Sequence, residues 1–458
     1  MTSSSDSATA AETGAPTLRQ RIQTGGAVVV AGFGFQNILR LISNLILTRL
    51  LVPEAFGLMS VAVSFSIWAA MLTDIGIGAS VVRSANADKP SFLRTAWVMQ
   101  IARNVAIGVF ILISALVVTG LRSLGIVGEQ SIFADPILPW IMVAMGFQVM
   151  STGFTSMNMS LASRRLMMGR LVALEISGQL IAMACTIGFA LAGFGVWSLV
   201  IGLTASGAFS TVISHFIFPG PKMRPQFDRA FAAEIFHFGK WLIIASSFGF
   251  LLNRGDHMIL GWLMPGDDFS QYAVAMIWIG AGIGVVQTVI TRIFFPGFSE
   301  IIREQPEKLK PAYERARAFA DGFSILVALG VYFFADEALR LVYPEAFQPV
   351  GDYARLLAPA FLFLPYRILH SIVLADGDSR GFSGVTVVSG FVMLLAMPMA
   401  YHMLGETAAI LVYACISIVG LPTLWRAASK TMKLNTIVEG RLLISAALLL
   451  CAMGMGFG

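Results

Sequence analysis

The chain has 458 residues, of which 57% are hydrophobic and only 12% are charged. A soluble domain carries about 25% charged residues, and a chain this apolar could not cover a water-facing surface without large exposed patches, so a soluble enzyme and a disordered chain are excluded. The net charge of +5 does not indicate nucleic-acid binding, because the basic residues fall in short loops and form no continuous stripe.

Thirteen apolar segments follow one another along the chain, and most have the roughly 20 residues that a helix needs to cross a bilayer. The alternation of polar and apolar residues that marks an outer-membrane barrel is absent, so the spans are predicted to be helices. Their approximate bounds are 25–48, 57–80, 96–119, 136–158, 171–191, 195–217, 238–263, 270–294, 316–334, 353–374, 383–402, 407–425 and 441–457. The predicted fold class is all-α, a polytopic membrane protein with 12–13 transmembrane helices. Whether 441–457 spans the membrane stays open.

The positions of the basic residues predict the orientation of the chain. With the N-terminus in the cytoplasm, 22 of the 31 Lys and Arg fall in cytoplasmic loops, 4 fall in external loops and 5 lie within spans. A cytoplasmic N-terminus is therefore expected. The external loops are all short, which leaves no room for a bulky external domain of the kind that a membrane-embedded polymerase uses.

Two stretches of the chain resemble each other at an offset of 213 residues, since 46–62 and 259–275 are identical at six of seventeen positions. Six spans in each half would make two parallel repeats around a central cavity, an arrangement typical of transporters. The expected domains are a disordered cytoplasmic tail at 1–24, an N-terminal six-helix bundle at 25–217, a cytoplasmic linker at 218–237, a C-terminal six-helix bundle at 238–430 and an additional transmembrane segment at 431–458.

Polar residues in the first span form a stripe. Ionisable residues inside spans are costly and normally face a cavity or a partner. Asn37, Arg40, Asn44 and Thr48 are spaced 3, 4 and 4 residues apart, which puts them on one face of a helix. We expect Asn37, Arg40 and Asn44 to line the cavity. The alternative for Arg40 is a side chain that reaches outward to the interface or pairs with a carboxylate of another span.

Two later spans each hold an arginine and a histidine on one face. Arg254 and His257 are three residues apart in the seventh span, and Arg367 and His370 repeat this spacing in the tenth. All four are candidate cavity residues. Asp256 lies two positions from Arg254, so it is expected to point toward another helix, either in the cavity or in a structural ion pair.

The charges within the spans are mainly basic, with five arginines against three carboxylates. The planar fork of arginine suits phosphate or pyrophosphate and stays charged at low dielectric, so an anionic, phosphate-bearing substrate is expected. An exporter of drugs or cations would instead carry an excess of carboxylates. The sequence holds no nucleophile–base pair, nucleotide motif or metal-ligand spacing, so we expect no enzyme, no cofactor and no metal site.

Four motifs resemble those of polysaccharide-transporter flippases, the exporters of lipid-linked oligosaccharide, O-antigen and exopolysaccharide units in the multidrug/oligosaccharidyl-lipid/polysaccharide superfamily. The resemblance covers roughly residues 20–430 and departs from the family at the C-terminus, where many members have twelve or fourteen spans. The motifs are Arg-Leu-Leu-Val-Pro-Glu-Ala-Phe-Gly at 49–57, Gly-Phe-Gly-Val-Trp-Ser-Leu-Val at 193–200, Phe238-Gly239 followed by Asp256 and Ile259-Leu260-Gly261, and Phe-Pro-Gly-Phe-Ser at 295–299.

The resemblance implies two six-helix bundles and alternating access between the two sides of a bacterial inner membrane. The implied substrate is an undecaprenyl-pyrophosphate-linked oligosaccharide, which moves from the cytoplasmic to the periplasmic leaflet for exopolysaccharide, capsule or O-antigen synthesis. Arg40, Arg254 and Arg367 would hold the pyrophosphate and sugar acids, and Asp74 or Asp256 would couple transport to H⁺ or Na⁺. Polysaccharide polymerase or export machinery is the expected protein partner, and no nucleic acid is expected.

Three alternatives stay open. A multidrug or cation antiporter and a lipid-II-type flippase belong to the same superfamily. A membrane-embedded polysaccharide polymerase or transferase belongs to a different functional class, which the short external loops and the missing acid–base residues oppose.

Overall fold

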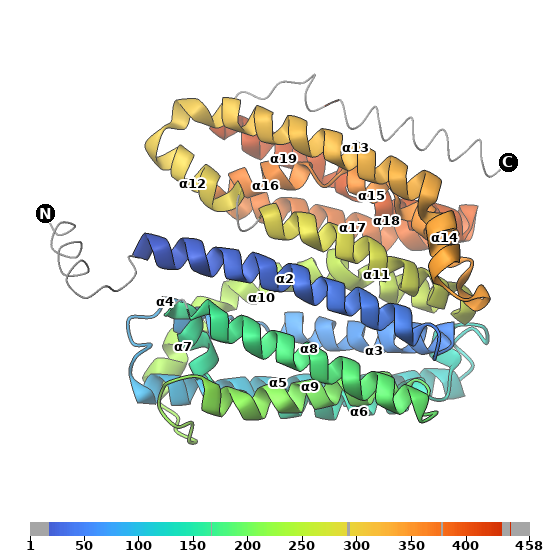
Figure 1. The fold of residues 1–458 in the computed structure, drawn as a ribbon, viewed down its shortest axis with the longest axis horizontal. Coiled ribbons are helices and arrows are strands. Elements are labelled where there is room, and N and C mark those ends of the chain that lie inside the picture. Colours follow the sequence, from blue (N-terminus) through green and yellow to red (C-terminus); the bar gives the residue numbers. More distant parts are fainter. Residues whose placement is uncertain (1–17, 166, 291–293, 377–378, 433–439, 441–458) are drawn as a thin grey trace, which may run out of the picture.

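All regular structure in the described residues is helical, apart from one isolated bridge between Ser131 and Pro265. The computed structural model describes residues 18–165, 167–290, 294–376, 379–432 and 440. Figure 1 shows the helices, which are α2 (Leu18–Leu47), α3 (Pro53–Leu72), α4 (Ile77–Arg83), α5 (Pro90–Ser123), η1 (Ile132–Ala134), α6 (Leu138–Thr152), α7 (Asn158–Arg164), α8 (Met168–Leu191), α9 (Trp197–Ile217), α10 (Arg229–Leu263), α11 (Gly266–Val289), α12 (Phe295–Glu304), η3 (Pro306–Lys308), α13 (Leu309–Val342), η4 (Glu345–Phe347), α14 (Val350–Leu357), α15 (Pro359–Leu362), α16 (Tyr366–Ala375), α17 (Ser379–Leu404), α18 (Glu406–Cys415) and α19 (Ser417–Thr431).

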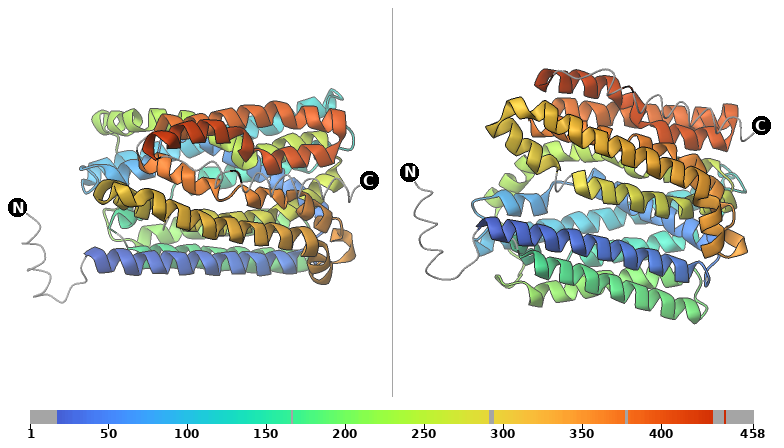
Figure 2. Two further views of the ribbon diagram at one scale, coloured as in Figure 1. Left: turned by 90° about the horizontal axis from the view of Figure 1, so that it is seen from above. Right: turned by 45° about the horizontal axis from the view of Figure 1, so that its top comes forward.

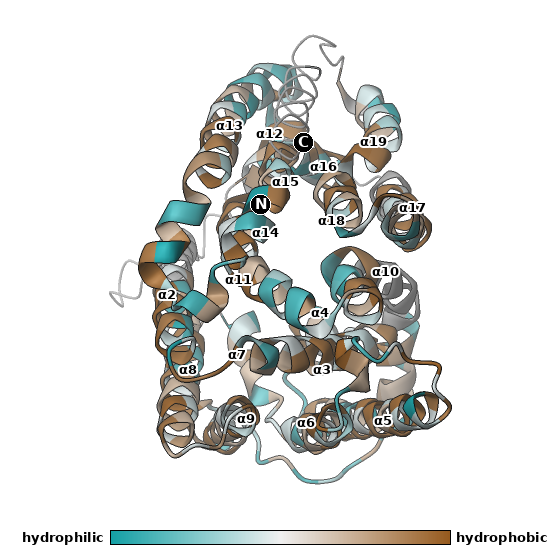
Figure 3. Cartoon of the chain, turned by 90° about the vertical axis from the view of Figure 1, so that its right-hand side faces the viewer, coloured by the Kyte–Doolittle hydropathy of each residue, from teal (hydrophilic) through white to brown (hydrophobic). Residues whose placement is uncertain are grey.

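The long helices run side by side along one axis of the molecule in every view (Figure 2). Within the described residues, eight helices are long and apolar enough to cross a membrane, or nine if the pair Glu345–Leu362 and Tyr366–Ala375, bent by 44°, is one broken span. Seen from one end, hydrophobic residues dominate the outer helices such as α5, α8 and α9 (Figure 3). The prediction of an all-α polytopic membrane protein is confirmed, because only helices satisfy their own backbone groups in lipid without closing a barrel.

Local sequence explains where several helices begin and end. Pro53 and Pro90 occupy the first positions of α3 and α5, where a missing N–H costs no helical hydrogen bond. The side chain of Asp228 accepts hydrogen bonds from the first backbone N–H groups of α10. Gly76 has a φ of 58°, a left-handed conformation that separates α4 from α3. This break divides the predicted span 57–80.

Two predicted boundaries differ from the structure, and a third prediction is not tested. The helix α2 begins at Leu18, so the predicted tail at 1–24 includes residues that are helical, while 1–17 lie outside the described residues. The predicted linker at 218–237 is too long, because the N-cap at Asp228 starts α10 at Arg229. The predicted last span, 441–457, lies outside the described residues.

The helices form two groups on either side of α10. In the first group, α8 packs on α2 and α9, and α3 packs on α5 and α6. In the second, α17 packs on α18 and α19, and α14 packs on α11 and α13. We call the end of the molecule at which α2 begins the near end, and the opposite end, at which α2 stops, the far end (Figure 1).

The two groups contact each other at the far end. Tyr343, which follows α13, donates a hydrogen bond to the Asn44 side chain on α2 at 2.5 Å and accepts one from the Trp278 indole on α11. The rings of Phe56 and Phe347 meet edge to face, with centroids 5.9 Å apart. These contacts join α2 and α3 to the second group, and we call them the far-end contacts.

The helix α10 is joined to both groups. At the near end, Glu234 accepts hydrogen bonds from Ser84 and Asn86, and the backbone N–H of Asp228 donates to Thr95. Farther along, α10 packs against α3 in the first group and α17 in the second. The helix that follows the linker therefore does not belong to the second group alone.

Gly57 permits the closest approach between α3 and α11, because a Cβ there would overlap Ser270 Oγ. We expect Gly57→Ala to lower the free energy of unfolding by about 1–3 kcal/mol, the usual penalty of overpacking. Thermal unfolding of the purified protein in detergent would measure this. Ser270→Ala in the same variant should restore part of the loss, since it removes the overlapping hydroxyl.

The matched control is Gly34→Ala in α2, where no heavy atom lies within 4 Å of the added Cβ. This substitution should be neutral or stabilising, because alanine favours a helix by about 1 kcal/mol over glycine. Equal stability of the Gly57 and Gly34 variants would contradict the close packing of α3 on α11.

Candidate functional site

A buried acidic centre lies where α10 crosses α11. Asp256 is fully buried, and its Oδ2 accepts a hydrogen bond from the Tyr272 hydroxyl on α11 at 2.6 Å. His257 Nδ1 lies 2.8 Å from the same oxygen, and the histidine is 1% exposed. Asp256 Oδ1 is also buried and accepts no hydrogen bond from any residue that the structure describes. A carboxylate with a spare acceptor in such a place can take a proton or a cation.

Arg254 determines the proton position on His257. Its Nη1 lies 3.2 Å from His257 Nε2. A guanidinium only donates, so Nε2 is the acceptor and the imidazole proton of the neutral ring is on Nδ1, facing Asp256. Arg254 and His257 therefore lie on one face of α10, and Asp256 contacts α11.

Arg367 lies at the start of α16 and donates a hydrogen bond to the Gln287 side chain of α11 at 2.6 Å. His370 is half-buried, one turn further along α16. The Asp256 centre and Arg367 both contact α11, through Tyr272 and Gln287 respectively. We call Arg254, Asp256, His257, Tyr272, Gln287 and Arg367 together the second-group cluster.

The stripe on α2 is separate from this cluster. Asn37 is buried and donates to the backbone carbonyl of Phe33 at 2.8 Å, while Asn44 is buried in the far-end contacts. Arg40 is exposed, and no hydrogen bond or ion pair joins it to the rest of the described chain. The alternative pairing of Arg40 with Asp74 or Asp256 is not present.

Asp74 lies at the near end rather than in a span. It accepts a hydrogen bond from the Gly76 backbone at 3.0 Å and faces Arg103 at 3.9 Å, with its side chain 39% exposed. Arg103 also donates to the carbonyl groups of Ala70 and Thr73, which the end of α3 leaves without helical partners. Arg103, paired with Asp74, therefore caps the C-terminal end of α3.

Sequence reasoning missed a second buried charge. Arg317 was assigned to a cytoplasmic loop, but it lies in α13 and is 0% exposed. Its Nε donates to Asp321 at 2.6 Å, and its guanidinium lies 4.0 Å from the centroid of the Tyr366 ring. The four-residue spacing of Arg317 and Asp321 was the available signal, since it allows an ion pair on one helix face.

The predicted site residues carry charges of both signs. Arg40, Arg254 and Arg367 supply cationic side chains, while Asp256 is the carboxylate of the second-group cluster. Within the described ranges, no group of three or more His, Cys, Asp and Glu side chains could hold a metal ion.

Two relatives show similarity over much of the chain. The lipopolysaccharide biosynthesis protein WzxC of Escherichia coli is 20% identical over 72% of this chain and 63% of its own length. The succinoglycan biosynthesis transport protein ExoT of Rhizobium meliloti is 20% identical over 72% of this chain and 65% of its own length. The match thus spans less than two thirds of each relative.

Solved transporters share the fold. The lipid II flippase MurJ in an inward closed conformation superposes with a TM-score of 0.64 at 11% identity, covering 93% of this chain and 98% of its own. An inward-facing multidrug resistance transporter of the MATE family superposes with a TM-score of 0.62 at 15% identity, covering 89% of this chain and 96% of its own. The model of the polysaccharide biosynthesis protein family matches residues 46–351, which is more than half of the chain, and this protein therefore belongs to that family.

Proposed function

We propose that this protein is a flippase that moves lipid-linked oligosaccharide units, carried on undecaprenyl pyrophosphate, between the leaflets of a bacterial inner membrane. The observation that carries the proposal is the set of arginines Arg40, Arg254 and Arg367 on the helices α2, α10 and α16, in a protein of the polysaccharide biosynthesis family. A pyrophosphate with acidic sugars needs cations that stay charged at low dielectric, and arginine meets this need. The names of the relatives and of the flippase that shares the fold support the same substrate class.

In this proposal the near end, at which α2 begins, faces the cytoplasm, because the predicted distribution of Lys and Arg along the sequence favours a cytoplasmic N-terminus. The first and second groups of helices act as two bundles, and α10 is joined to both. The far-end contacts close the periplasmic side, so the substrate enters from the cytoplasm. Breaking these contacts would open the path to the periplasm.

The buried acidic centre is the proposed coupling site. Asp256 has one carboxylate oxygen without a hydrogen bond from the described residues, and His257 and Tyr272 hold the other. Entry of H⁺ or Na⁺ would neutralise Asp256 and weaken its hold on α11 through Tyr272. Asp74 is the weaker candidate for this role because it already pairs with Arg103.

A multidrug or cation antiporter is the alternative transporter, and the excess of arginine over carboxylate argues against it. A lipid-II-type flippase differs from the proposal only in the glycan it carries. A polysaccharide polymerase or transferase would need an acid–base pair. We therefore propose that the protein is not an enzyme, and that polymerase or export proteins act on its product.

Replacing Arg40 or Arg254 by alanine should stop surface polysaccharide export while protein levels stay normal. One charged hydrogen bond to phosphate contributes about 1.5–3 kcal/mol, which corresponds to roughly a tenfold to hundredfold loss of transport. Arg122→Ala is the control, because Arg122 is an exposed arginine in the last turn of α5 and the substitution removes the same charge. Full export by both variants would remove these two residues from the binding site.

Reconstitution tests the function itself. In proteoliposomes with labelled undecaprenyl-pyrophosphate oligosaccharide, the sugar should become accessible to a glycosidase on the opposite side of the bilayer. A fluorescent organic cation should not move. Transport of the cation without transport of the sugar would favour the antiporter.

Asp256→Asn should abolish accumulation driven by an ion gradient while equilibration without a gradient persists. Tyr272→Phe should reduce the dependence on the gradient, because it removes the hydrogen bond to Asp256. Tyr332→Phe on α13 is the matched control. Imposing H⁺ and Na⁺ gradients separately identifies the ion, and unchanged gradient-driven transport by Asp256→Asn would exclude coupling at this residue.

A further inference from the structure

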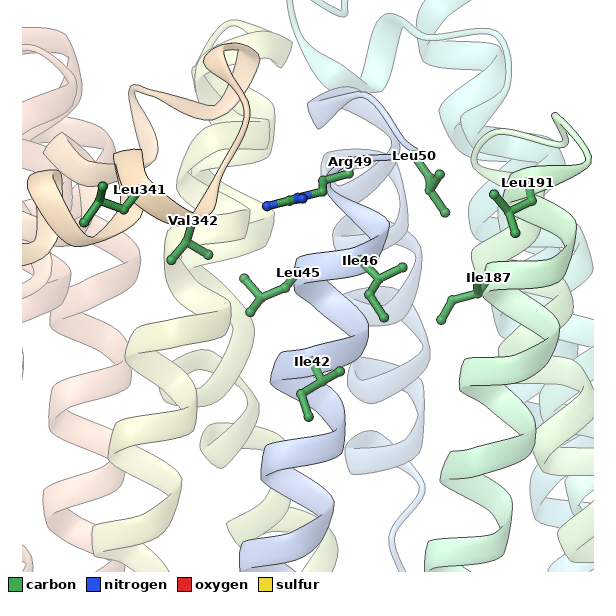
Figure 4. Close-up of a pocket in the computed structure, with 9 residues that line it drawn as sticks. All are labelled: Ile42, Leu45, Ile46, Arg49, Leu50, Ile187, Leu191, Leu341 and Val342. Atoms are coloured by element: carbon green, nitrogen blue, oxygen red, sulfur yellow. The ribbon is translucent and has the colours of Figure 1, made fainter.

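An apolar groove runs between the far-end turns of α2, α8 and α13 (Figure 4). It has a volume of about 600 Å³ and is lined by eight aliphatic residues and one arginine, Arg49. A pocket of this size falls in the range that binds small ligands, about 300–1,000 Å³. Ile46 and Leu341 in its walls are 37% and 86% exposed, so the groove opens to the outside of the helix bundle.

Arg49 is the cation of this groove. It follows α2 directly, and its guanidinium reaches across the groove toward Val342 (Figure 4). Its side chain is exposed and forms no hydrogen bond or ion pair with any other part of the described chain. The turn that carries it joins α2 to the candidate membrane span α3, so Arg49 is expected at the depth of the lipid headgroups, where phosphate groups are found.

The groove borders the far-end contacts. Leu45 lines the groove, and its neighbour Asn44 turns inward to Tyr343. Val342 lines the opposite wall and directly precedes Tyr343. A molecule in the groove would therefore touch both groups of helices, beside the hydrogen bond that joins them.

We propose that this groove binds a phosphate-bearing, long-chain lipid from the leaflet at the far end. The aliphatic walls bury the chain, and Arg49 binds the phosphate. The arrangement of the groove matches the two parts of such a lipid. Arg49 lies at the end where the phosphate would be, and the aliphatic residues lie along the path of the chain. Close packing of the chain against the aliphatic walls and pairing of the phosphate with a guanidinium both favour this occupant. The site is outside the second-group cluster, so the inference holds whichever solute crosses the membrane.

The test uses the full-length protein in phosphatidylcholine nanodiscs, titrated with dioleoyl phosphatidic acid, with bound lipid counted by native mass spectrometry. The wild-type protein should retain phosphatidic acid in preference to phosphatidylcholine. Arg49→Gln should weaken this binding at least tenfold. Ile46→Trp, which fills the groove and keeps Arg49, should weaken this binding as well. Weaker binding by both variants would locate the bound lipid in the groove.

Arg122→Gln is the matched control, because it removes one exposed far-end arginine outside the groove, and it should bind like the wild type. Inorganic phosphate at the same concentration should not compete, since it lacks the chain. Equal binding by the wild-type and Arg49→Gln proteins would overturn the proposal. Competition by inorganic phosphate would also overturn it, because it would indicate an anion site without a lipid.

Discussion

The contact between the two groups of helices at the far end is the constraint on which the other features depend. It consists of a tyrosine shared between an indole and an asparagine, an edge-to-face pair of phenylalanines, and a glycine that lets α3 approach α11. Small residues let membrane helices approach closely, and packing at this distance replaces the hydrophobic effect, which is weak between helices in lipid. The same contact positions the α2 stripe relative to the second-group cluster and forms the floor of the lipid groove.

Buried charge is the second organising principle. A carboxylate or guanidinium in a membrane protein is expensive to desolvate, and it persists only with close partners. Asp256 has Tyr272 and His257, whereas Arg317 has Asp321 and the face of Tyr366. The two sites differ in kind. The first leaves an acceptor oxygen of Asp256 open among the described residues, which suits reversible ion binding, and the second holds α13 against α16.

The sequence predicted what local periodicity controls. The spans followed from hydropathy, and the pairing of Arg254 with His257 followed from their three-residue spacing on a helix. The contacts of Asp256 with Tyr272 and of Asn44 with Tyr343 could not be predicted, because they depend on which helix faces meet, and the second pair is separated by 299 residues. Arg317 was misplaced for a related reason. A hydropathy profile assigns a charged residue such as Arg317 to the exposed surface. The ion pair with Asp321, four residues further along α13, allows Arg317 to be buried.

The double attachment of α10 has a mechanical consequence. Its first turns are hydrogen-bonded to the first group through Glu234, while Asp256 is held by Tyr272 of the second group. Any rocking of one group against the other must then bend the helix between Glu234 and Asp256 or break the Glu234 contacts. The free-energy difference between the states open to the two sides of the membrane would then include the cost of bending α10, which a flexible connection would not impose. Substitutions at Ser84 or Asn86, far from any substrate, would shift that balance.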